Sequence, residues 1–152
     1  DEPYAEEIAR QIVRTERHTA IRTTRALYEV IEKALQRVRL QRDEKGNLPE
    51  RRDIIRKSSA RVFQALRIDV NHEYEVLYEF MEKLPDALAL GGRAAILTFH
   101  SGEDRIVKKA FKAFHQQGIY REIARDVIRP SREECYENSR AHSTKLRWAI
   151  KA

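Results

Sequence analysis

The stretch Arg93-Ala-Ala-Ile-Leu-Thr-Phe99 decides the fold class, because it is a short apolar run that does not alternate with polar residues. It follows the turn signal Gly91-Gly92 and precedes a helical pattern that Ser101 or Gly102 begins and that ends near Gly118. A run of this kind is typical of a strand buried on both faces, as in a parallel α/β sheet. The sequence therefore predicts an interior strand followed by a helix.

The region before this strand is predicted to be helical, because its apolar residues recur at helical spacing. Pro3, with Asp1 and Glu2 before it, is expected to start the first helix, and Thr23 or Thr24 to cap the second. A loop is expected over 41–50, and the helix resumes near Ser59. Pro85 is expected to break or restart that helix. The restarted helix is expected to face inward through Val70, Tyr74 and Leu77.

Two further strands are predicted after the helix, over 119–128 and 146–150. Three strands form a very small sheet for so apolar a central strand, and an uncovered edge invites pairing with another chain. We therefore expect part of the sheet to lie outside this sequence. The helical start without an initiator Met likewise indicates a trimmed or truncated product.

The composition is that of a basic, cysteine-poor chain of one ordinary domain. Its 152 residues carry a net charge of +6 and its pI is about 9.6, which favours an anionic partner such as nucleic acid, although a merely soluble basic protein has the same balance. The charge is concentrated at the two ends, because residues 62–103 hold 3 basic and 7 acidic side chains. The lone Cys135 excludes an internal disulfide and fits a reducing, cytoplasmic compartment. No run of 18 apolar residues occurs, so no membrane contact is expected.

Three segments together resemble one protein family. They are Arg61-Val-Phe-Gln-Ala-Leu-Arg-Ile-Asp-Val-Asn71, Gly91-Gly-Arg-Ala-Ala-Ile-Leu-Thr-Phe-His-Ser-Gly-Glu-Asp-Arg-Ile-Val-Lys108 and Asn138-Ser-Arg-Ala-His-Ser-Thr-Lys-Leu-Arg147. In this order they resemble the MraW (RsmH) family of small-subunit rRNA methyltransferases. The departures suggest a divergent branch: Ser58-Ser59 stands where the family usually has His-Pro, Gly102 replaces Leu, Ser139 replaces Pro and His142 replaces Arg.

The resemblance implies methylation of the exocyclic amine of a cytosine in rRNA near the decoding centre, with S-adenosylmethionine as donor. It also implies a doubly wound, Rossmann-like class I methyltransferase sheet with a helical domain inserted mid-chain. On that template, residues 1–58 are the later part of the helical insert and 59–152 are the C-terminal half of the catalytic core. The donor-binding half has no counterpart, and the five glycines form no G-x-G loop after a strand. No cofactor-binding residue is therefore expected in this chain.

Four candidate catalytic residues follow the apolar strand: His100, Ser101, Glu103 and Asp104. Ligand groups gather at the carboxyl ends of strands in open α/β sheets. Methyl transfer to a weakly nucleophilic amine needs positioning and removal of a proton, for which a His or a carboxylate is suited. The structural alternative is that Ser101 caps the helix, that the two acids favour its N-terminal dipole and that Arg105 pairs with them.

Candidate RNA contacts come mainly from a basic, hydroxyl-rich loop before the last strand. Such side chains suit phosphate and sugar contacts, and a solvated loop is the alternative. The full set is Arg61, Arg67, Arg105, Arg140, His142, Ser143, Lys145 and Arg147. The five histidines and single cysteine show no zinc-ligand spacing, so no metal site is expected.

Three functions compete at this point. The first is an rRNA methyltransferase of which this chain is a C-terminal fragment, inactive alone, with ribosomal RNA of the small subunit as partner. The second is a non-catalytic RNA-binding module, and the third is a subunit that completes its sheet with a separate chain or, as a homodimer, with a second copy.

Overall fold

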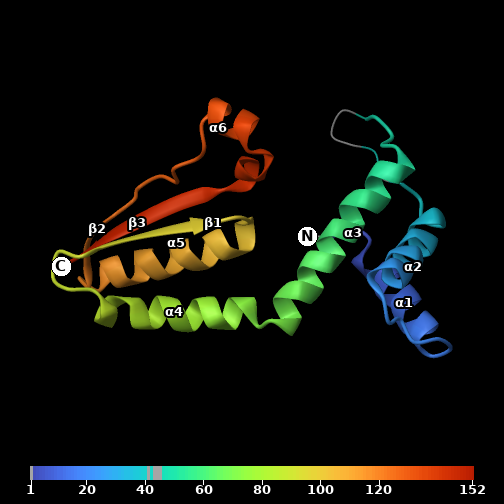
Figure 1. The fold of residues 1–152 in the computed structure, drawn as a ribbon, viewed down its shortest axis with the longest axis horizontal. Coiled ribbons are helices and arrows are strands. Elements are labelled where there is room, and N and C mark those ends of the chain that lie inside the picture. Colours follow the sequence, from blue (N-terminus) through green and yellow to red (C-terminus); the bar gives the residue numbers. More distant parts are fainter. Residues whose placement is uncertain (1, 41, 43–45) are drawn as a thin grey trace. The chain divides into compact units, whose positions relative to one another are not determined.

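The computed structural model describes residues 2–40, 42 and 46–152, and the chain divides into two compact units after Asn71. In the first unit the described residues form helices and connecting loops, and in the second they combine helices with a small sheet (Figure 1). The elements are α1 Ala5–Glu16, α2 Thr24–Gln36, α3 Arg51–Val70, α4 Glu73–Ala87, β1 Arg93–Thr98, α5 Ser101–Gln116, β2 Tyr120–Ile123, α6 Arg132–Glu137, η1 Ser139–Ser143 and β3 Lys145–Lys151. No helix in this described part is long and apolar enough to cross a membrane.

The first unit packs α1, α2 and the start of α3 around one apolar cluster. Ile31 and Leu35 are completely buried, and Ile55 brings α3 into the same cluster. The cap of α2 is confirmed at Thr23, whose hydroxyl accepts a hydrogen bond from the backbone N–H of Ala26. The predicted start of the third helix near Ser59 is wrong. The helix begins at Arg51, because Ile55 is already anchored in the core.

Some predicted features fall on residues outside the described ranges. These are Asp1, whose acidic side chain is expected near the start of the first helix, and residues 41 and 43–45 of the predicted 41–50 loop. The described part of that loop contains neither helix nor strand.

The helix is interrupted at Asn71-His72, between α3 and α4, whereas the sequence predicts one continuous inward-facing stripe of apolar residues through this point. His72 adopts a left-handed backbone with φ of 51°, which stops the first helix before the second begins. Pro85, expected to break or restart the helix, lies inside the last turns of α4. The two compact units divide at this break, whereas the predicted domain boundary at 58/59 lies within α3. The assignment of 1–58 to an inserted domain stays a prediction.

The sheet has the order β1-β3-β2, and both pairings are antiparallel. Since β1 and β2 both oppose β3, they run parallel to each other, and α5 connects them as a crossover helix. The prediction that the apolar strand is interior and paired in parallel is therefore not met among the described residues. β1 is an edge strand, because β3 inserts between the two parallel strands. The last strand is confirmed at 145–151, and the strand predicted over 119–128 shortens to β2 with one further bridge between Ile128 and Leu146.

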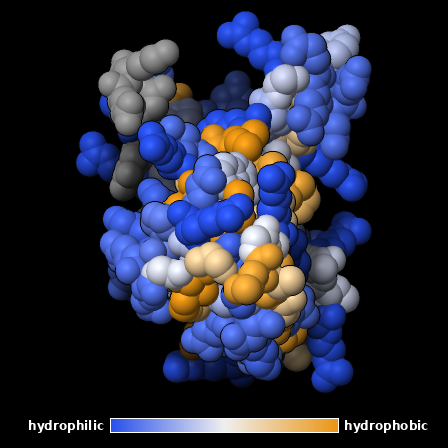
Figure 2. Space-filling model, turned by 90° about the vertical axis from the view of Figure 1, so that its left-hand side faces the viewer, coloured by the Kyte–Doolittle hydropathy of each residue, from blue (hydrophilic) through white to orange (hydrophobic). Residues whose placement is uncertain are grey.

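One face of this sheet is covered and the other is open. α5 lies along the covered face, as Figure 1 shows, and the core there includes Val107, Phe111 and Tyr120. In β1, Ala94 and Thr98 are buried, whereas Leu97, on the opposite face, is 51% exposed. The prediction that β1 is buried on both faces is therefore wrong for this structure. Hydrophobic side chains also remain visible among hydrophilic ones on the face shown in Figure 2.

Candidate active site

The loop that follows β1 is held by His100, the residue before α5. Its Nδ1 accepts a hydrogen bond from the backbone N–H of Glu103 at 3.4 Å. In return, Glu103 Oε2 accepts hydrogen bonds from the backbone N–H groups of Phe99 at 2.8 Å and of His100 at 3.3 Å. This reciprocal arrangement is a capping box, which satisfies N–H groups that the helix leaves unpaired. The helix start predicted at Ser101 or Gly102 is confirmed, whereas the structural alternative in which Ser101 caps the helix is wrong. Ser101 is the first helical residue and is exposed.

The second nitrogen of the same imidazole ring is the most unusual polar atom of the site. His100 Nε2 is buried and makes no hydrogen bond, although it lies 3.2 Å from Glu103 Oε1. When Nδ1 accepts a hydrogen bond, the proton of a neutral ring is on Nε2, so this atom faces a carboxylate without a well-aligned bond. A buried N–H in this state is costly unless a water, an ion or a ligand group accepts its hydrogen bond.

Glu73, at the start of α4, completes a group of three potential ligands with His100 and Glu103. Their ligating atoms lie within 4.8 Å of one another. Such a group can in principle hold a cation, but Glu103 Oε2 is already engaged by two backbone N–H groups. Sequence analysis missed Glu73, because only the packing of α4 against α5 brings it to this place and no local spacing signals it.

Tyr74, predicted to face inward, packs partly buried against the core of the second unit and also lies over the same loop. Its ring centroid is 6.0 Å from that of His100, with the rings tilted by 52°. A Cβ at position 102 would lie 1.9 Å from the Tyr74 hydroxyl oxygen, so only glycine leaves room for this tyrosine. The departure from Leu to Gly102 therefore has a structural explanation: the hydroxyl end of Tyr74 occupies that space.

Asp104, predicted as a catalytic candidate, joins α5 to the central strand. Arg147 donates to both of its carboxylate oxygens, at 2.6 and 3.2 Å, and Lys145 Nζ lies 3.6 Å away. Burial alone would raise the pKa of Asp104, but hydrogen bonding and charge from Arg147 and Lys145 outweigh it and hold that pKa below its ordinary value. The carboxylate is thus ionised and engaged. Arg147, a predicted RNA contact, is only 8% exposed.

Most of the predicted RNA-contacting loop lies at the same end of the sheet as His100. Thr98, the last residue of β1, is directly opposite Lys145, the first residue of β3. The turn η1 immediately precedes β3, and Arg140, His142 and Ser143 are exposed on it. The structure therefore brings together the two candidate groups that the sequence separates by about 40 residues.

The remaining predicted RNA contacts lie elsewhere. Arg105 is exposed on α5, and Arg67 is exposed on α3 in the first unit. Arg61, also on α3, pairs with Glu2 at 3.0 Å, and Glu2 in turn accepts a hydrogen bond from Ser58 at 2.9 Å. Arg61 thus has a role in holding the N-terminal segment against α3.

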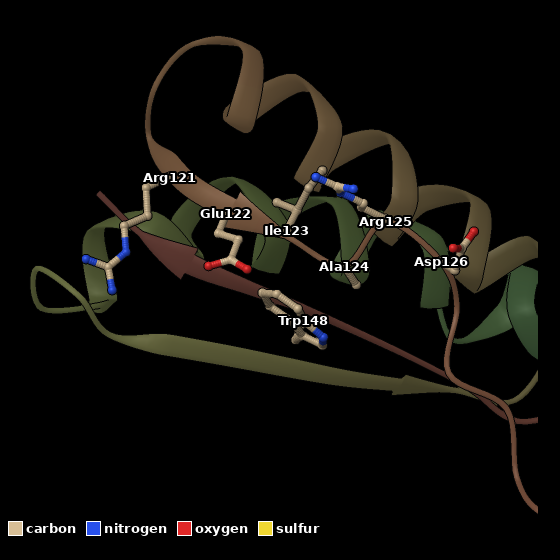
Figure 3. Close-up of a pocket in the computed structure, with 7 residues that line it drawn as sticks. All are labelled: Arg121, Glu122, Ile123, Ala124, Arg125, Asp126 and Trp148. Atoms are coloured by element: carbon tan, nitrogen blue, oxygen red, sulfur yellow. The ribbon is translucent and has the colours of Figure 1, made fainter.

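A hollow of about 700 Å³ lies beside β2 on the open side of the sheet. Figure 3 shows Glu122 and Trp148 on the same side, whereas Ile123 points toward α5. Arg121, Arg125 and Asp126 also line it. Its charges are mixed, because two carboxylates accompany the two guanidinium groups, so the hollow gives no preference for an anionic ligand.

Comparison with known proteins gives a consistent result. The profile of the family described as "MraW methylase family" matches residues 1–152. Two similar proteins are each named ribosomal RNA small subunit methyltransferase H 1: that of Agathobacter rectalis is 57% identical over all of this chain and 42% of its own length, and that of Lachnoclostridium phytofermentans is 57% identical over all of this chain and 40% of its own length. Ribosomal RNA small subunit methyltransferase H 2 of Alkaliphilus metalliredigens is 54% identical, with 100% and 42% coverage. The chain thus spans about two fifths of the length of these relatives.

Proposed function

The chain belongs to the MraW methylase family, and we propose on this basis that it forms the C-terminal part of an enzyme that methylates a cytosine in small-subunit rRNA. The acceptor in this proposal is the exocyclic amine of the cytosine, and the donor is S-adenosylmethionine. One observation carries the proposal: the end of β1 places the imidazole ring of His100 beside an exposed basic turn. These are the groups that an RNA amine needs when it loses a proton.

The residues of this chain do not by themselves fit the donor. Donor sites of this fold class use a glycine-rich loop at a helix N-terminus, where small residues let the backbone approach the ligand. In this chain the glycine at a helix N-terminus is Gly102, and the Tyr74 hydroxyl occupies the space beside it. We therefore assign the donor to the part of the longer relatives that this chain does not cover, and derive no step through it.

His100 is the best candidate for the proton acceptor. The accepting atom in this proposal is Nδ1, because the neutral ring carries its proton on Nε2. Nδ1 is bound to the Glu103 N–H in this structure and exchanges that donor for the acceptor amine. Glu103 Oε1 lies 3.2 Å from Nε2, and Glu73 lies on the same side of the ring. Ser101 is exposed beside the ring and is a candidate contact to the nucleotide. Asp104 acts indirectly in this proposal, because its pairing with Arg147 fixes the first turn of α5 against β3.

The basic turn is assigned to the acceptor strand. Arg140, His142 and Ser143 are exposed, and Lys145 reaches the same end of the sheet. Phosphate and ribose contacts from these side chains would orient the target strand without reading its bases.

The free edge of β1 supports a sheet that continues in a longer protein. Its outer side has no strand partner among the described residues, and its open face exposes Leu97. Since more than half of each relative's length lies outside the match, a strand from that region is the proposed neighbour. In that arrangement β1 becomes the interior strand that its sequence resembles.

A chimera tests the proposal. The matching two fifths of the Agathobacter rectalis relative are replaced by this chain, and transfer of labelled methyl groups to unmethylated small subunits is measured. We expect activity in the chimera and a loss of at least about 100-fold in His100→Asn. Asparagine is a good N-cap residue, so this substitution keeps the helix cap and removes the base. His18→Asn, at an exposed position of the first unit, is the matched control.

Two outcomes decide against the enzyme. A folded chimera that binds the donor but transfers no methyl group would favour the RNA-binding module, and a fully active His100→Asn chimera would remove His100 from the mechanism.

A further inference from the structure

A second basic feature lies on α5, away from the candidate active site. A groove of about 420 Å³ runs between α5 and the segment that follows β2. Its lining includes the exposed cations Lys108, Lys112 and Arg125, whereas Phe111 and Ile123 provide apolar surface. No acidic residue lines the groove.

The charge of this groove is available to a ligand. Among the described residues, Lys108, Lys112 and Arg125 have no ion pair, whereas Arg147 at one end is neutralised by Asp104. The hollow beside β2 shares Arg125 with the groove but differs from it, because Glu122 and Asp126 also line the hollow. The groove is therefore a place on this unit where cations line a hollow without acids, and a polyanion is the ligand that such a surface attracts.

A histidine and an apolar floor add shape to the charge. His115 Nδ1 lies 2.7 Å from the backbone carbonyl oxygen of Tyr120, so this nitrogen donates and the ring is held in place. Its Nε2 is then left for another partner. Phe111 is almost fully buried at the base of the groove and packs edge-on against Tyr120. Because Phe111 is covered, the half-buried Ile123 offers the exposed part of this apolar floor, against which a ribose or a base can pack.

The position of the groove connects it with the candidate active site. Lys108 and Lys112 lie eight and twelve residues beyond His100 on one helix, which is about 12 and 18 Å along its axis. They project from the α5 side of the sheet near β2, whereas the free edge is that of β1. A sheet that grows at β1 therefore leaves the groove open.

We propose that this groove binds the sugar-phosphate backbone of the rRNA strand that flanks the methylated nucleotide. This inference rests on the proposed function for the identity of the RNA, but the groove's affinity for single-stranded RNA is independent of methyl transfer. Lys108 and Lys112 each contact a phosphate, Arg125 faces them across the groove, and the apolar floor receives a sugar or a base.

The test measures binding of a fluorescein-labelled, unstructured single-stranded RNA of about 12 nucleotides to the 152-residue chain at several salt concentrations. We expect Lys108→Gln/Lys112→Gln to weaken binding by roughly tenfold and to reduce the magnitude of the salt slope by about 1.4, since each lost phosphate contact on a single strand contributes about 0.7. Lys108→Arg/Lys112→Arg should retain both values.

The matched control is Lys109→Gln/Arg129→Gln, which removes the same charge from exposed residues that do not line the groove. If the control weakens binding as much as the groove variant, diffuse attraction explains the affinity and the groove proposal fails. Absence of RNA binding by the unaltered chain also overturns it. An inactive chimera with groove-dependent RNA binding would instead refute only the proposed function, and an active chimera with groove-independent binding would refute only this inference.

Discussion

The two edge strands of the same sheet are built in opposite ways. β1 pairs regularly with β3 along all six of its residues, and four of these form the run Ala-Ala-Ile-Leu. β2 has only four residues, a register irregularity between Tyr120 and Glu122, and exposed charged side chains at Arg121 and Glu122. Short, irregular and charged strands are the usual protection of a sheet edge. The difference indicates that β2 is adapted to face water and that β1 is adapted to have a neighbour.

The largest expected effect is on the strand that both edges share. Asp104→Ala leaves Arg147 buried without its carboxylate, so we expect the free energy of unfolding to fall by about 3 kcal/mol. Hydrogen exchange should show that amides of β1 and β2 lose protection together, because both pair with β3. Urea denaturation measures the loss, and Asp126→Ala, at an exposed carboxylate, is the control. Loss of protection in only one edge would contradict the view that this ion pair supports the central strand.

The same ion pair predicts a pH dependence. Because the pKa of Asp104 is lowered in the folded state, its contribution to stability is fully present above the ordinary value of 3.8. That contribution is lost as the pH falls from there through the lowered native pKa. Unfolding followed between pH 5 and pH 2, a range of roughly three units around the carboxyl pKa values, should show a shallower acid loss in Asp104→Ala than in the unaltered chain. Equal slopes would show that the pair contributes nothing.

A smaller effect, on self-association of the chain, is expected from a substitution in β1 alone. Leu97 is 51% exposed on the open face, and a lysine there adds the charge that β2 already has. We expect Leu97→Lys to weaken self-association of the isolated chain by roughly tenfold, with a stability change within about 0.5 kcal/mol. Sedimentation velocity at several concentrations measures this. Leu90→Lys, at a leucine that is 84% exposed in the preceding turn, should leave association unchanged.

The smallest effect is expected at β2. Arg121→Val/Glu122→Val removes the charges of this edge, but the strand remains short and irregular. We expect association to increase by about twofold or less. If this variant associates through β2 as strongly as the unaltered chain associates through β1, then charge, and not strand length or irregularity, protects the β2 edge.

Local signals account for much of the fold. The Thr23 cap, the apolar spacing of α1 and α2, the helix after His100 and the last strand all follow from neighbouring residues, and the structure agrees with them. The errors arose where tertiary contacts prevail over local signals. α3 starts at Arg51 because Ile55 is needed in a distant cluster, and Pro85 is accommodated near the end of α4.

The candidate site divides in the same way. Sequence placed His100 and Glu103 at the end of an apolar strand, because strand, cap and helix are contiguous. It could not associate Glu73 and Tyr74 with them, nor pair Asp104 with Arg147, because those contacts join elements far apart in the chain. The structural alternative offered Ser101 as the cap, since a hydroxyl is the commoner cap and nothing local shows that an imidazole nitrogen reaches the Glu103 N–H.

By itself, the sequence determined the family resemblance, the basic character and the existence of an apolar strand that leads into a helix, because each of these depends on residue identity or short-range periodicity. Only the tertiary structure decided that this strand lies at an edge with one open face, that a basic turn shares its end of the sheet, and that α5 carries a second basic groove. The physical reason is that strand order and side-chain proximity are set by long-range pairing, on which a period of two or of 3.6 residues carries no information.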